Sequence, residues 1–199
     1  MENPASIRQF WFGEEADDLL TSQRQAALWW AKDEATDRLI HQRFESALTA
    51  AADGRLDDWA DSAEGVLALI LLTDQFPRNM YRGQARAFAF DAQARRWCRH
   101  ALERRMDAAL RPIERVFVYL PLEHSEALDD QRQVLELFGA LQQQAPAGRR
   151  ELYAGYLDFA QKHHDIIARF GRFPHRNAIL GRPSTPEESA FLQQPGSSF

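Results

Sequence analysis

Two short segments of this sequence combine arginine, asparagine and histidine in a pattern that suits the binding of an anion. The first runs from Asp74 to Gly83 (DQFPRNMYRG) and the second from Arg169 to Arg182 (RFGRFPHRNAILGR). In both, an apolar stretch leads into Phe-Pro, and Arg and Asn follow. Guanidinium groups beside buried neighbours are partly desolvated, so they need carboxylate, carbonyl or ligand partners. We therefore expect the two segments to share one site, with these ligand-binding residues: Arg78, Asn79, Arg82, Arg172, His175 and Arg176.

Acid–base groups stand in a third segment, Leu122–Glu126 (LEHSE), directly after Pro121. We expect a helix to begin here, with either Glu123 and Glu126 or Glu126 and Asp130 on one face at helical spacing. His163 shares a helical stripe with apolar residues, so it should face the core, two turns before the second arginine segment. Its imidazole could titrate near neutral pH. The sequence thus indicates the candidate catalytic residues Glu123, His124 and His163, any of which could move a proton.

The same residues also have a purely structural interpretation. Carboxylates of the third segment could form bidentate pairs with the arginines and hold the turns in place. An inward histidine such as His163 is often a satisfied core residue. A divalent-metal site from Glu123, His124, Glu126 and His163 is a further alternative, but spacing across separate helices is weak evidence, and no metal is predicted. The sequence identifies no cofactor.

Several other chemistries lack their motifs. The chain has no Gly-rich phosphate loop ending in Lys-Ser/Thr, no dinucleotide-binding fingerprint and no His-Glu-x-x-His. Cys98 lies on an apolar stripe among arginines, which favours an inert buried thiol over a nucleophile.

Composition predicts one globular domain over residues 1–199. Hydrophobic residues make up 45% of the chain and charged residues 27%, which is typical of a folded protein. The longest apolar run is too short to span a bilayer, and we expect no membrane association. Without an export signal, and with a single cysteine, the expected compartment is the cytoplasm.

Charge is distributed unevenly along the chain. The net charge is −5, yet residues 78–105 hold eight arginines against two acidic residues. Such a surface could contact phosphate backbones. The aromatic and glycine elements of single-strand readers are not interleaved with it, which argues against nucleic acid as a partner.

Helical signals dominate the chain and predict an all-α fold of eight or nine helices. Asn3 can cap the first helix and Gly13 can end it, Ser62 can cap a core helix, and Gly171 can end a long one. We expect Pro77 and Pro121 to end or interrupt their helices, because proline disfavours helical geometry at the preceding residue. The expected helices cover approximately residues 4–12, 19–30, 33–53, 63–76, 84–105, 112–120, 123–144, 150–170 and a short stretch from 186.

Several long motifs resemble an uncharacterised bacterial family of domain-of-unknown-function proteins. They are FWFG at 10–13, DQFPRNMYRG at 74–83, YLPLEHSE at 119–126 and RFGRFPHRNAILGR at 169–182. The resemblance covers nearly the whole chain and implies an all-helical, tetratricopeptide-repeat-like fold, without supplying a reaction. It also implies that the family's polar signature falls on Asp74, Arg78, Asn79, Arg82, Glu123, His124, Glu126, His163, Arg169, Arg172, His175, Arg176 and Asn177.

Three functions follow as hypotheses. The first is a pocket that is lined by Arg, His and Glu and binds a small anionic molecule, and that could also be the active site of an enzyme. The second is a helical-repeat-like scaffold that binds a protein partner, in which the signature residues are structural. The third, compatible with both, is a homo-oligomer formed through aromatic residues near the N-terminus: Phe10, Trp11, Trp29 and Trp30.

Overall fold

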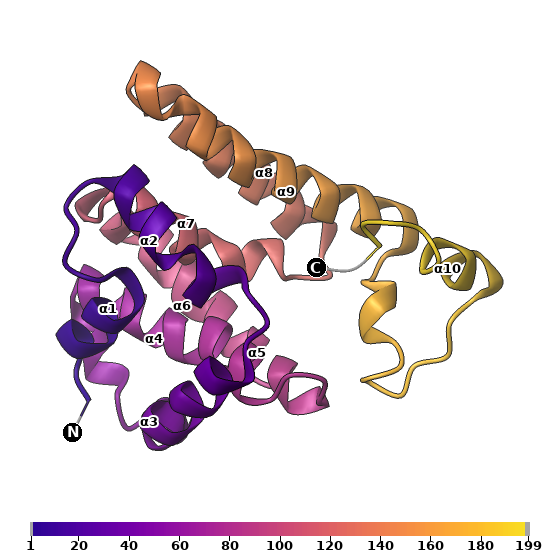
Figure 1. Ribbon diagram of the computed structural model, residues 1–199, viewed down its shortest axis with the longest axis horizontal. Helices are drawn as coiled ribbons and strands as arrows, with labels where there is room; N and C mark the ends of the chain where they lie inside the picture. The colour runs from indigo at the N-terminus through magenta and orange to yellow at the C-terminus, as the bar shows by residue number, and fades with distance from the viewer. Residues whose placement is uncertain (1, 198–199) are drawn as a thin grey trace.

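The computed structural model describes residues 2–197, which form helices and connecting turns without a strand (Figure 1). The π-helical turn Leu71–Gln75 joins α4 and α5 into one continuous helix, so residues 2–197 contain nine α-helices when these two are counted as one, together with short 3-10 turns. The prediction of an all-α domain is confirmed, whereas a tetratricopeptide-like array stays a prediction. The α-helices are α1 (Pro4–Phe12), α2 (Asp18–Trp30), α3 (Glu34–Ala52), α4 (Ala63–Ile70), α5 (Phe76–Met80), α6 (Asp91–Glu103), α7 (Pro112–Glu123), α8 (Leu128–Gln144), α9 (Arg150–Phe170) and α10 (Pro186–Phe191).

The core surrounds α4 and α7, which are apolar on most of their circumference. Every residue of α4 from Gly65 to Ile70 is buried, as its all-round apolar pattern predicted. Aromatic side chains of α1, α2 and α7 meet beside it, with Phe117 at ring-centroid distances of 5.7 Å from Trp11 and 4.8 Å from Trp29. This packing gives the polar residues at the ends of α4 and α7 a rigid support.

Most of the predicted helix ends are confirmed. The Asn3 side chain accepts a hydrogen bond from the Ser6 amide, and the Ser62 side chain accepts one from Gly65. Gly13 and Gly171 end α1 and α9 with φ values of 70° and 68°, a region that favours glycine.

The prediction that Pro77 ends the core helix is wrong. The chain stays helical through Pro77 to Met80, because the turn before it widens into a π-helix. There the Phe76 amide donates to the Leu71 carbonyl, five residues back. Pro77 then occupies the first turn of α5, directly after this change in hydrogen-bond spacing.

Pro121 does not interrupt its helix either. It lies inside α7, which ends only at Glu123, so Leu122–Glu126 ends a helix instead of beginning one. The buried side-chain amide of Gln131 donates to the carbonyl of Glu123, the last residue of α7, at 2.6 Å and to that of Ser125 just beyond it at 2.7 Å. Glu123 and Glu126 therefore do not share a helical face. The expected helix over 84–105 is also divided, into the 3-10 turn Ala85–Phe88 and α6.

Helices α8 and α9 form an antiparallel hairpin along one side of the molecule (Figure 1). At its base, residues 171–197 fold into turns and α10 and pack around a small second cluster of Ile166, Ile167 and Phe173. Among the described residues, no helix has the length and apolar character needed to cross a bilayer.

Candidate functional site

The π-helical turn places a buried carboxylate, that of Asp74, in the interior beside the end of α7. Its side chain has no solvent exposure. It accepts a hydrogen bond of 2.6 Å from Gln75 and lies 3.2 Å from Nη1 of Arg78. Burial alone would raise the Asp74 pKa, but the charges of Arg78 and His124 outweigh it and lower the pKa to about 2. Asp74 is therefore a permanent anion at neutral pH. π-helical turns are frequent at functional sites.

His124 caps the C-terminus of α7 and pairs with this anion. Its Nδ1 lies 2.9 Å and 3.1 Å from the two Asp74 carboxylate oxygens. A carboxylate can only accept, so Nδ1 carries the proton and Nε2 holds a lone pair. Burial and the neighbouring Arg78 lower the His124 pKa, against the opposite effect of Asp74. Within residues 2–197 no side chain or carbonyl hydrogen-bonds to Nε2, which is thus able to accept a proton.

The two arginine segments meet at one residue, Asp91 at the start of α6. Arg78 Nη1 lies 3.1 Å from one of its carboxylate oxygens, and Arg176 Nη1 lies 3.4 Å from the other. Both guanidinium groups also rest over the ring of Phe88, at 5.8 Å and 4.7 Å from its centroid. Asp91 and Phe88 therefore join parts of the chain that are far apart in sequence.

Arg176 is a buried cation with incomplete pairing. Only 6% of its surface is exposed, and its Nε is enclosed without an acceptor. Its guanidinium group is held between the rings of Phe88 and Phe173, the second at 4.5 Å. Burial and Arg78 lower the Arg176 pKa to about 10, so the group is charged at neutral pH yet poorly compensated.

A hollow of about 430 Å³ opens beside these groups. Residues from four parts of the chain line it, and the following matter for its chemistry: Phe88, Asp91, Arg95, His124, Glu126 and Arg176. The sequence predicted His124 as a catalytic residue and Arg176 as a ligand-binding residue, and both line the same hollow in the structure.

Glu123 and His163 lie behind His124, outside the lining of the hollow. His163 Nδ1 donates to the Phe159 carbonyl at 2.9 Å and lies 3.2 Å from the Glu123 carboxyl. Burial, with Asp74 nearby, raises the Glu123 pKa to about 8, and burial lowers that of His163 to about 3. Near neutral pH the pair is therefore a protonated acid beside a neutral imidazole.

The remaining predicted ligand-binding residues face other partners. Arg82 and Asn79 both bond to Asp37, at 2.7 Å and 2.9 Å. Arg172 forms two bonds to Glu188, of 2.6 Å and 2.8 Å. His175 is half-buried beside Phe173, and burial and Arg176 lower its pKa to about 4. Of the six predicted ligand-binding residues only Arg176 is among the residues that line the hollow, and Arg78, Asn79, Arg82, Arg172 and His175 are not.

Two residues of the site, Asp91 and Arg95, were assigned no site role by sequence reasoning and were only counted among the charges of residues 78–105. Glu126 does not share a helix face with Glu123, but it forms the bidentate carboxylate–arginine pair that the structural interpretation predicted for this segment. It accepts hydrogen bonds from the Phe173 amide at 2.8 Å and from Arg182 at 2.7 Å and 2.9 Å. A spacing rule could not have found these contacts, because each joins separate elements.

The metal alternative receives no geometric support. In residues 2–197 no group of three or more His, Cys, Asp or Glu side chains gathers as metal ligands. Cys98 is buried, and burial raises its thiol pKa, in keeping with the inert thiol that its sequence context predicted.

Comparison with known proteins gives a family and a fold. Residues 7–196 match the family described as bacterial protein of unknown function (DUF924). A solved structure of a protein of unknown function, ATU0120 from Agrobacterium tumefaciens, is 40% identical, covers 96% of each chain and superposes with a TM-score of 0.80. Among curated proteins none matches the sequence.

Proposed function

This chain belongs to the DUF924 family of bacterial proteins of unknown function, and we propose from its geometry that it binds a small anionic molecule in the hollow beside His124 and Arg176. In this proposal Arg176 holds the anionic group. His124 accepts a proton from the bound molecule, so the site has the elements of an acid–base enzyme.

The main observation behind the proposal is that the Arg176 guanidinium is buried and incompletely paired. Its only ionic contact in the described chain is the 3.4 Å approach to Asp91, a carboxylate that Arg78 also uses. Burial removes the guanidinium group from water, and with Nε unbonded its protein partners replace only part of the lost hydration. An anion at the hollow would supply the missing partner, and a bidentate carboxylate or phosphate suits the planar guanidinium best.

The state of the Asp74–His124 pair supports the proton-transfer role. At neutral pH the imidazole is neutral, its Nδ1 proton is held by Asp74, and its Nε2 lone pair is unoccupied. If Nε2 takes a proton, the resulting imidazolium is stabilised by the Asp74 carboxylate at 2.9 Å, as in other carboxylate–histidine pairs. The uncharged Glu123–His163 pair behind it adds no competing charge, so we assign those two residues a positioning role.

A thermal-shift comparison tests the ligand. Formate, acetate, malonate and orthophosphate are titrated against the wild type, Arg176→Met and Arg82→Met. Methionine keeps an apolar chain between Phe88 and Phe173, and Arg82 is a matched signature arginine outside the hollow. We expect an anion to raise the Tm of the wild type and Arg82→Met but not of Arg176→Met, because a ligand of the folded state stabilises it by mass action.

Two results would count against the proposal. If all three proteins respond equally to every anion, Arg176 does not hold the ligand. If Arg176→Met and Arg176→Lys both fail to fold by circular dichroism, the guanidinium is an internal strut.

A protein-interaction surface is a second candidate, favoured by exposed aromatic residues. Trp30 on α2 is 50% exposed and Phe159 on α9 is 53% exposed, and Tyr156, three residues before Phe159 on the same helix, lies 6.3 Å from Trp30. Trp11 and Trp29, which also suggested an oligomer, are instead buried in the core. Light scattering of the wild type and of Trp30→Ser with Phe159→Ser tests this surface, because only a surface used for self-association would change the measured mass.

A further inference from the structure

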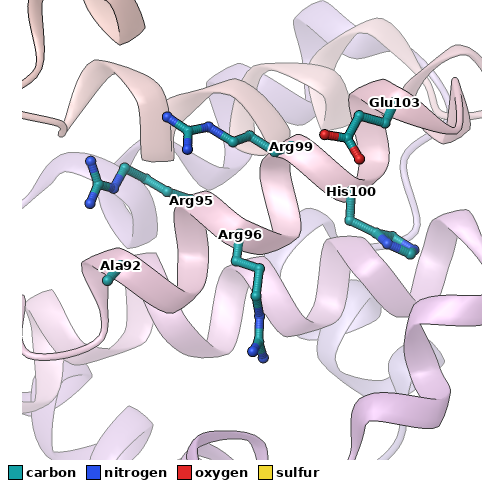
Figure 2. Close-up of a pocket in the computed structure, with 6 residues that line it drawn as sticks. All are labelled: Ala92, Arg95, Arg96, Arg99, His100 and Glu103. Atoms are coloured by element: carbon teal, nitrogen blue, oxygen red, sulfur yellow. The ribbon is translucent and has the colours of Figure 1, made fainter.

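Helix α6 carries a second hollow, of about 330 Å³, which is lined by residues of this helix alone. Figure 2 shows Arg95 and Arg99 extending from one side of the helix and Arg96 from the other, with Glu103 one turn beyond Arg99. Residues four apart are neighbours on a helix surface, about 6 Å apart along its axis. The arginines therefore form the two walls of a short trough.

The trough has more positive charge than its neighbours neutralise. Arg95 and Arg99 share one carboxylate, that of Asp130, at 3.3 Å and 2.7 Å. Arg96 stacks on the ring of Trp97 at 4.6 Å, and within residues 2–197 no carboxylate lies at ion-pair distance from it. Two of the three guanidinium groups are thus anchored in place while positive charge remains for a ligand.

We propose that this trough binds a compact oligophosphate chain, a ligand distinct from the small anion proposed for the His124 hollow. An oligophosphate places several charged oxygens against both helical turns at once, whereas a single carboxylate or phosphate group reaches only one. Arg95 lines both hollows, but the walls formed by Arg96 and Arg99 belong to this trough alone.

Two features favour a short anion over a nucleic-acid strand. Glu103 stands at the far end and would repel a chain that continued past Arg99. The ring of Trp97 is only 6% exposed and is covered by Arg96, so it is not available to stack on an unpaired base.

Isothermal titration calorimetry with tripolyphosphate, at roughly 0.01 M ionic strength where charges are weakly screened, tests the proposal. Arg96→Glu reverses one wall without breaking an ion pair, and we expect it to weaken binding about tenfold. Glu103→Gln should tighten binding by about two- to threefold, since it removes the repelling acid. Arg38→Glu, an exposed arginine of α3, changes the net charge equally and should leave binding almost unchanged.

Further ligands show whether the bound phosphate chain belongs to a nucleotide. Magnesium-free ATP that binds more tightly than tripolyphosphate would support the proposal with a nucleotide as carrier, and equal affinities would support recognition of the phosphate chain alone. The proposal is overturned if orthophosphate binds as tightly as tripolyphosphate, if a short single-stranded RNA binds more tightly, or if Arg96→Glu and Arg38→Glu have equal effects. None of these variants touches Arg176 or His124, so failure here leaves the proposed function open to its own test.

Discussion

The imidazole Nδ1 of His124 lies 2.9 Å from the carboxylate of Asp74, across 50 residues of sequence. The contact depends on the π-helical turn that contains Asp74. A π-helical turn adds one residue to the helix, and each residue of an α-helix rotates the next by about 100°. Without that added residue, the positions on the two sides of the turn would be aligned differently. The backbone irregularity thus determines the partner of His124.

We expect Asp74→Asn to lower the free energy of unfolding by about 3 kcal/mol or more, because it leaves Arg78 and His124 beside a neutral group in a buried site. Urea denaturation at pH 7 measures this loss. The difference should shrink as pH falls from about 5 towards 2: the depressed Asp74 pKa contributes stability above the unfolded pKa that is lost on protonation. A difference that is constant over this range would show that the charge of Asp74 is not what stabilises the fold.

Glu123→Gln should have the opposite pH dependence. The folded-state pKa of Glu123 is raised to about 8 from an ordinary 4.5, so the folded wild type must hold a proton that the unfolded chain releases. Between these values the wild type loses stability as pH rises, by a few kcal/mol at most. The glutamine variant lacks this loss, so its stability relative to wild type should increase from pH 5 to pH 8.

Denaturation at pH 5, 6.5 and 8 provides the comparison. The folded-state pKa of His163 is lowered to about 3, so the unfolded chain binds a proton at His163 more readily and the folded state loses stability as pH falls below the ordinary histidine pKa. This loss occurs in the wild type and in the variant, and it largely cancels in the difference between their free energies of unfolding. A variant whose stability relative to wild type does not change with pH would mean that Glu123 is ionised in the folded protein.

Helix ends were predicted correctly where the signal is local. The cap at Ser62 needs only its own hydroxyl and the Gly65 amide three residues on. The end at Gly171 needs only a residue that adopts a positive φ. Such signals do not depend on the rest of the fold, so they are readable from a few neighbouring residues.

Both predictions at proline were wrong, although the π-helical turn beside Pro77 is itself local. Pro121 stays within α7, and the carbonyl at the end of that helix accepts a hydrogen bond from Gln131, a residue of the next helix that no local pattern could have identified. The site shows the same limit. His124 and Arg176 were recognisable as residue types, but their joint position depends on Asp91 and Phe88, whose role comes from packing. Sequence reasoning therefore found reactive groups more readily than the residues that hold them.

A pair of glycine substitutions tests the support of α4. A Cβ at Gly65 would lie 1.9 Å from the Trp59 carbonyl oxygen, so Gly65→Ala must displace buried backbone and should cost about 3 kcal/mol or more. Gly155→Ala is the matched control in α9, where a Cβ meets nothing within 4 Å. It should stabilise the protein by about 0.5 to 1 kcal/mol, since alanine is the better helix former. Equal effects in thermal denaturation would contradict the packing described here.

Glu126→Gln should loosen the segment that carries Arg176 without unfolding the core. Glu126 accepts hydrogen bonds from the Phe173 amide and from both terminal nitrogens of Arg182, and glutamine keeps one acceptor oxygen but no charge. We expect amide hydrogen exchange over residues 173–191 to accelerate by an amount that corresponds to about 1 to 2 kcal/mol, while α4 and α7 exchange as in the wild type. Glu187→Gln is the control, because its pair with Arg169 is mostly exposed and contributes little stability.

Faster exchange throughout the chain would indicate global destabilisation, and unchanged exchange over 173–191 would show that Glu126 does not hold the segment.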